Sequence, residues 1–113
     1  MTLPKAARIL RRREFLRVQQ KGRRLYSGEV VVIALDSGGT RTRIGITVSS
    51  KVANAVGRNR VKRWVREAFR AARSSLPPVD LVVVARRGAT EMGLAGAQRA
   101  LAAAAAALSG GPP

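Results

Sequence analysis

The sequence predicts a single α+β domain, residues 1–113, in which a four-stranded, mostly antiparallel sheet packs against helices. The chain has 113 residues and 46% of them are hydrophobic, which is enough for one core. Apolar runs typical of strands alternate with stretches of helical periodicity, and Gly or Pro clusters separate them. The expected order of elements is α-β-β-β-α-β-α, with the helices covering one face of the sheet.

The N-terminal part predicts an arm, a helix and two strands. Residues 1–10 are basic and lack an apolar period, so we expect a flexible arm. Residues 12–20 have the pattern of a helix, with Phe15, Leu16 and Val18 as its apolar members and Gly22 as its end. A short strand is expected near 24–27. A longer one, reaching residue 36, contains the β-branched run at 30–33.

Residues 43–49 alternate as a strand with one buried face should. Ile44, Ile46 and Val48 fall on one side. The other side holds Arg43, Gly45, Thr47 and Ser49. This second side is small and polar, so the sequence predicts that one face of the sheet stays open.

The C-terminal half predicts a long helix, a strand and a last helix. The long helix is expected over residues 53–74, before two prolines, and an apolar strand follows at 80–86. Thr90 can cap a last, alanine-rich helix that runs to about Leu108. Residues 109–113 are expected to form a flexible tail.

The charge of the chain predicts a polyanionic partner. It has 22 Lys and Arg against six Asp and Glu, a net charge of +16. Such an excess favours nucleic acid first and an anionic membrane second. No apolar run is long enough for a membrane span or a signal peptide, so we expect a cytoplasmic protein that uses no membrane. No feature of the sequence indicates a protein partner.

The residue types argue against catalysis by this chain alone. There is no His and no Cys, which removes the commonest general base and the soft metal ligands. The six carboxylates are scattered and form no pair at the spacing that catalytic metals need. We therefore expect no catalytic residue and no metal or cofactor held by the protein.

The long helix separates apolar from cationic residues. Val61, Trp64, Val65, Ala68 and Ala72 cluster on one side. The opposite side holds Asn59, Arg63, Arg66 and Arg70, with Lys62 and Arg73 beside them and Arg58 and Arg60 at the N-terminal flank. A solvated face normally mixes charges of both signs, and here Glu67 alone opposes the cations. Contact with RNA or DNA therefore explains this face better than hydration does.

These residues, taken in order, resemble a known family. Arg58-Asn59-Arg60 is followed by Lys62-Arg63 and then by Arg66-Glu67, which is similar to the RNR signature of the protein subunit of bacterial ribonuclease P. Residues 14–22 and 77–86 also resemble that family, so the resemblance spans about residues 8–88.

The resemblance implies a role in tRNA maturation. In that family an RNA subunit, with Mg²⁺, hydrolyses one phosphodiester of precursor tRNA, and the protein assists. The helix with the RNR motif would lie in a left-handed βαβ crossover and bind the catalytic RNA. The residues implied in this contact are Arg58, Asn59, Arg60, Lys62, Arg63, Arg66 and Arg70.

The resemblance also implies a cleft for the single-stranded 5′ leader of precursor tRNA, between the first helix and the sheet. The residues implied there are Phe15, Arg17, Ile33, Arg43 and Lys51. Phe15 could stack on a base or belong to the core. Gln19 and Ile33 stand where the family often has aromatic residues, and Tyr26 is a possible substitute ring. The alternatives are a ribosomal or generic RNA-binding protein, a DNA-binding architectural protein and an autonomous nuclease.

Overall fold

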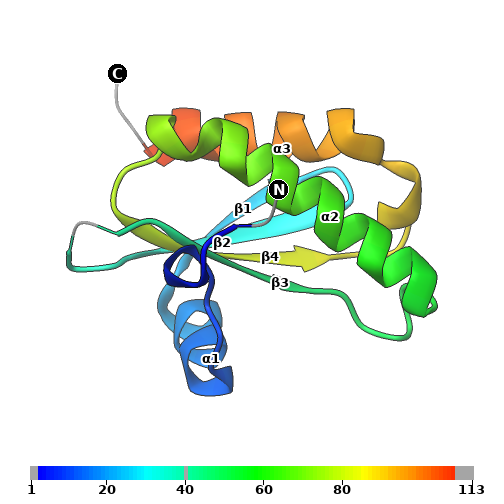
Figure 1. The fold of residues 1–113 in the computed structure, drawn as a ribbon, viewed down its shortest axis with the longest axis horizontal. Coiled ribbons are helices and arrows are strands. Elements are labelled where there is room, and N and C mark those ends of the chain that lie inside the picture. The colour runs from blue at the N-terminus through cyan, green and yellow to red at the C-terminus, as the bar shows by residue number, and fades with distance from the viewer. Residues whose placement is uncertain (1–2, 40, 109–113) are drawn as a thin grey trace.

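The computed structural model describes residues 3–39 and 41–108. It contains the predicted elements in the predicted order (Figure 1). They are α1 (Arg12–Lys21), β1 (Arg23–Ser27), β2 (Val30–Asp36), β3 (Arg43–Thr47), α2 (Ala55–Ala72), β4 (Val79–Ala85) and α3 (Gly93–Leu108), with short 3₁₀ helices at Lys5–Ala7, Arg73–Ser75 and Ala89–Glu91.

The four strands form one mixed sheet in the order β1-β2-β4-β3. β1 pairs with β2 and β2 with β4 in antiparallel fashion, whereas β3 runs parallel to β4. The prediction of a mostly antiparallel sheet is therefore confirmed. Parallel neighbours need a crossover connection, and α2 provides it between β3 and β4.

The helices cover both faces of the sheet, so the expectation that they share one face is wrong. In Figure 1, α2 and α3 lie above the strands and α1 lies below them. The larger core lies between the sheet and the α2–α3 layer, where Val32, Leu81, Val61, Phe69 and Leu101 are almost fully buried. Phe69, which the apolar stripe predicted from the sequence did not include, completes the buried side of α2.

The alternation in β3 predicted that the other face of the sheet is open, and this prediction is wrong. Val18 of α1 packs there with Ile9, Val31, Ile33 and Val82 to form a second, smaller core. The small residues on this side of β3 are needed because α1 packs against them. A polar and glycine-containing strand face thus predicted exposure where the structure uses it for close packing.

Residues 3–10 do not form the predicted flexible arm. Leu3, Ala7 and Ile9 are buried, and the backbone N–H of Ile9 donates a hydrogen bond to the carbonyl of Ile44 at 2.9 Å. This segment therefore lies along β3. The remaining two residues of the arm and the predicted tail, residues 109–113, lie outside the described residues.

The ends of the later helices differ slightly from the predictions. The side chain of Asn54 accepts a hydrogen bond from the backbone N–H of Gly57 at 2.9 Å, which caps α2 and sets its start at Ala55. Thr90 does not cap α3. It lies inside the 3₁₀ helix Ala89–Glu91, and α3 begins at Gly93, whose φ of 68° suits glycine.

Candidate nucleic-acid interfaces

The outer side of α2 is an exposed cationic surface. Val61, Val65 and Ala68 are buried against the core, as predicted, so the opposite side of the helix faces solvent. We call this the cationic face of α2; its exposed members are Asn59, Arg60, Arg63, Arg66 and Arg70. Arginine carries a planar fork of donors that binds phosphate oxygens bidentately, so this row suits a nucleic-acid backbone.

Two of the predicted contact residues lie at the border of the cationic face. Arg58 and Lys62 are half-buried. One guanidinium N–H of Arg58 donates to the carbonyl of Ala53 at 2.9 Å, which fixes this side chain beside the start of α2. Arg58 is therefore a preorganised cation at the N-terminal end of the helix, where the helix dipole adds positive potential.

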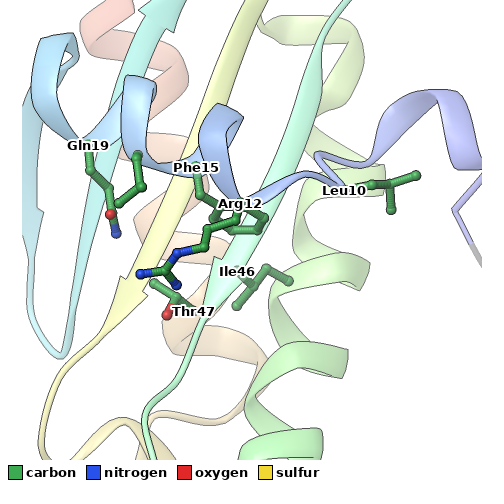
Figure 2. Close-up of a pocket in the computed structure, with 7 residues that line it drawn as sticks. Leu10, Arg12, Phe15, Gln19, Ile46 and Thr47 are labelled. Atoms are coloured by element: carbon green, nitrogen blue, oxygen red, sulfur yellow. The ribbon is translucent and has the colours of Figure 1, made fainter.

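A groove lies between α1 and β3, on the side of the sheet away from α2. It encloses about 360 Å³. Figure 2 shows the residues that line it, with the side chain of Arg12 extending past the ring of Phe15 toward Thr47. The residues that line it are Leu10, Arg12, Phe15, Leu16, Gln19, Ile46 and Thr47. Apolar, aromatic and cationic groups thus share one open groove, which suits a base and a phosphate together.

The ring of Phe15 is at once a wall of the groove and part of the second core. It packs against that core and is only half-buried. A Cβ atom on Gly45 would lie 2.6 Å from the Cε1 and Cζ atoms of the ring, so the ring rests directly on the backbone of β3. Phe15 therefore belongs partly to the second core and also lines the groove, and its stacking on a base stays a prediction.

Gly45→Ala should displace the ring of Phe15. A methyl group cannot fit 2.6 Å from ring carbons, so we expect a loss of about 1–3 kcal/mol in the free energy of unfolding. Urea denaturation of the variant measures this loss. Gly39→Ala is the matched control, since a Cβ there meets nothing within 4 Å. Equal stability of the two variants would show that the ring does not rest on β3.

Arg43 forms an ion-pair network rather than an open phosphate contact. Its Nε and Nη2 atoms donate to the two carboxylate oxygens of Asp80, each at 2.9 Å, and its Nη1 atom donates to Glu14 at 3.2 Å. The hydrogen bonds that Arg43 donates to Asp80 are the main reason that the pKa of Arg43 is raised above its ordinary value, with Glu14 adding to the effect. These bonds connect β3 to β4 and to α1, so Arg43 holds the helix that forms the groove.

The other residues predicted for the cleft are dispersed. Ile33 is fully buried in the second core, so its predicted contact with a ligand is wrong. Arg17 is exposed on α1 and Lys51 is exposed in the turn after β3, but neither lines the groove. Of the five residues predicted for the cleft, the structure places only Phe15 in the wall of the groove.

Several groove residues were missed from the sequence although a signal was present. Arg12, Phe15, Leu16 and Gln19 follow the i, i+3, i+4, i+7 spacing of one helix face. Thr47 belongs to the side of β3 that alternation had already separated from the apolar side. The spacing in α1 identifies the groove wall once it is known that α1 lies over β3.

Residues 3–39 and 41–108 were compared with the requirements of a metal site and of a membrane-spanning helix. No three Asp or Glu side chains lie together there as a group that could hold a metal ion. None of the helices is both long and apolar enough to cross a membrane.

The family model and the known proteins that resemble this chain point to the same family. Residues 3–109 match the model of the family described as Ribonuclease P. The ribonuclease P protein component of Citrifermentans bemidjiense is 44% identical over 86 residues, which cover 76% of this chain and 74% of that protein. The relatives that match are named as ribonuclease P components, and they do not support the alternative of a generic or ribosomal RNA-binding protein.

Solved structures of the same kind share the fold. The RNase P protein of Staphylococcus aureus is 35% identical with a TM-score of 0.78, and the match covers 88% of this chain and 92% of that one. The RNase P protein of Thermotoga maritima is 31% identical with a TM-score of 0.79, over 91% of this chain and 98% of that one.

Proposed function

Because the chain belongs to the ribonuclease P protein family and is the protein component of this tRNA-processing enzyme, we propose that it binds two RNAs at once. The cationic face of α2 binds the catalytic RNA subunit of ribonuclease P. The groove beside Phe15 binds the single-stranded 5′ leader of precursor tRNA. The protein thereby assists the endonucleolytic removal of the leader, which leaves the mature 5′ end of the tRNA in the cytoplasm.

The position of the two surfaces carries this proposal. α2 and α1 lie on opposite faces of one sheet, as Figure 1 shows, so the cationic face and the groove point in different directions. One RNA can therefore be bound on each side without competition. The rigid sheet between them fixes the distance from the catalyst to the leader, and a fixed geometry favours a productive complex.

In the proposed complex the hydrolysis is carried out by the RNA subunit and its Mg²⁺ ions. The described residues of this chain do not fit a metal site, since their carboxylates form no cluster and the chain has no His or Cys. The work of the protein is to bind and orient. Its arginines offset the repulsion between the phosphates of catalyst and substrate, an effect that matters most when Mg²⁺ is scarce.

Reconstitution tests this function directly. The chain is combined with a bacterial ribonuclease P RNA at low Mg²⁺, and cleavage of precursor tRNA is followed by gel electrophoresis. We expect faster cleavage at the mature 5′ end than with the RNA alone. An unchanged rate would overturn the proposed function, and cleavage by the protein alone would identify it as a nuclease.

Phe15→Ala should weaken binding of the leader. A base stacked on an aromatic ring contributes about 1–3 kcal/mol, so the affinity of the holoenzyme for precursor tRNA should fall by that amount. Filter binding measures it, with tRNA that lacks a leader as the reference. Phe15→Leu is the control for packing, because it keeps an apolar side chain over Gly45 and removes only the ring. Equal losses for tRNA with and without a leader would contradict the stacking role.

A further inference from the structure

Tyr26 is an exposed aromatic ring that the groove beside Phe15 does not include. It lies in β1, the edge strand on the far side of the sheet from β3, and 66% of its surface is exposed. Tyrosine is enriched where proteins contact their partners, because its ring offers a large contact area. Its position on the sheet indicates which partner.

The strand register places Tyr26 on the same face of the sheet as the groove. Tyr26 pairs with Val31 of β2, Val31 with Val84 of β4, and Val84 with Thr47 of β3. Val31 belongs to the second core, which lies on the α1 side, so this whole row faces that side. Thr47 lines the groove. The row thus joins the groove to Tyr26 across three strand spacings, roughly 14 Å.

α1 covers the row of the sheet next to the Tyr26 row. The covered row contains Gly45, Val82 and Ile33, which are buried beneath α1 and the segment before it. The guanidinium of Arg24 donates to the carbonyl of Gln19 at 3.1 Å, which attaches the covered end of β1 to α1. In the next row Thr47 and Val84 are half-exposed, Val31 is buried and Tyr26 is exposed. The row thus forms an apolar floor, covered at Val31, between the groove and Tyr26.

A cation is held beside the ring at the end of this floor. The guanidinium carbon of Arg86 lies 5.8 Å from the centre of the Tyr26 ring, and its Nη2 atom donates to the carbonyl of Gly28 at 2.6 Å. Arg24, which lies on the same face of β1 as Tyr26, and Arg87, which directly follows Arg86, are also exposed. An aromatic ring among arginines is suited to a nucleotide, because the base stacks while the phosphate is neutralised.

We propose that Tyr26, with Arg86 against its ring, is a second base-stacking platform for the 5′ leader of precursor tRNA. It binds a leader nucleotide beyond those held in the groove beside Phe15. This inference rests on the proposed function, since it extends the same RNA track from β3 across the sheet to β1. The protein would then gain affinity from longer leaders, up to the length that reaches Tyr26.

A series of leader lengths tests the platform. Holoenzymes are reconstituted with the wild-type chain, Tyr26→Ala, Tyr26→Phe and the surface control Gln98→Ala, which lies on α3 on the other side of the sheet. Binding of precursor tRNAs is measured as the leader is lengthened one nucleotide at a time. For long leaders, Tyr26→Ala should bind about 5- to 150-fold more weakly than the wild type. For leaders too short to leave the groove the two should be equal.

The controls separate this inference from the proposed function. Tyr26→Phe keeps the ring and should bind like the wild type, as should Gln98→Ala. If the affinity of the wild type and of Tyr26→Ala rises equally with leader length, Tyr26 is not a stacking platform and the proposed function stands. If the wild type neither stimulates cleavage nor gains affinity from any leader, the proposed function fails and the platform fails with it.

A fluorescent base gives a second readout that does not depend on the overall affinity. 2-Aminopurine is placed at successive leader positions, and its emission is quenched where it stacks. Tyr26→Ala should restore emission at one position beyond the groove and leave the positions at Phe15 quenched. Restoration at no position would overturn the stacking role even if the affinity fell.

Discussion

Arg43→Ala should lower the free energy of unfolding by about 3–5 kcal/mol, as expected when one partner of a buried ion pair is removed. The side chain of Asp80 is only 7% exposed, and both of its oxygens accept hydrogen bonds from Arg43. Without the guanidinium, this carboxylate would stay buried and unpaired. Glu14 would lose its bond as well, so α1 would be held less firmly over the sheet. Urea or thermal denaturation measures the loss.

A double-mutant cycle shows whether the pairing itself is responsible. The double variant Arg43→Ala with Asp80→Ala removes both charges. Its loss in the free energy of unfolding should therefore be smaller than the sum of the losses of the two single variants. Arg17→Ala is the matched control, because it removes an exposed arginine of α1 and should change stability by less than about 0.5 kcal/mol. Additive losses from the two single variants would mean that Arg43 and Asp80 do not stabilise the fold as a pair.

Titration of Arg43 should not change this stabilisation at any pH below the ordinary arginine pKa. A raised pKa means that the folded state favours the protonated guanidinium. The contribution is therefore fully present below the ordinary arginine pKa and is lost only when the pH rises above it. At neutral pH the network should be intact, and the groove with it.

Replacing Arg60 and Arg63 together with Ala should weaken binding of the catalytic RNA without unfolding the protein. Both side chains are exposed on α2, so the core loses nothing. Two charge-assisted contacts to phosphate would contribute roughly 3 kcal/mol at low salt. The loss of two phosphate contacts should also reduce the slope of log K against log salt by about two. Titration of the RNA subunit at several salt concentrations measures both effects.

The control for net charge lies on the neighbouring helix. Arg99→Ala removes an exposed cation of α3, outside the cationic face of α2, so it should change the slope by much less. Arg60→Lys with Arg63→Lys keeps the charge and loses the bidentate fork, so it should retain most of the slope but bind more weakly. Binding by the double alanine variant that equals the wild type at every salt concentration would show that this face is only hydrated.

In the proposed function, the opposed surfaces let one small chain bind both RNAs. The cationic face belongs to the layer of α2 and α3, and the groove belongs to the layer of α1. Defects at one surface should therefore leave the other intact: the Arg60 and Arg63 variant affects assembly with the catalyst, and Phe15→Ala affects the leader. Arg43→Ala is different, because loosening α1 changes the groove without touching the RNA directly.

The sequence alone determined the elements and the cationic side of α2. These follow from local periodicity: Val61, Val65 and Ala68 lie on one side of a helix whatever it packs against, and the arginines must lie on the other. The same local rule identified the strands, since β-branched runs and alternation require no knowledge of distant residues. The RNR order of residues 58–60 is likewise a property of the chain itself.

Only the tertiary structure decided which element covers which face, and the groove depends on that choice. Arg43 and Asp80 meet across 37 positions of the chain because β3 and β4 are parallel neighbours, a pairing that neither strand encodes locally. Ile33 became core and Phe15 became a groove wall because α1 crosses to the second face of the sheet. Periodicity tells which side of an element is apolar, but the partner of that side is set by contacts between distant segments that form together.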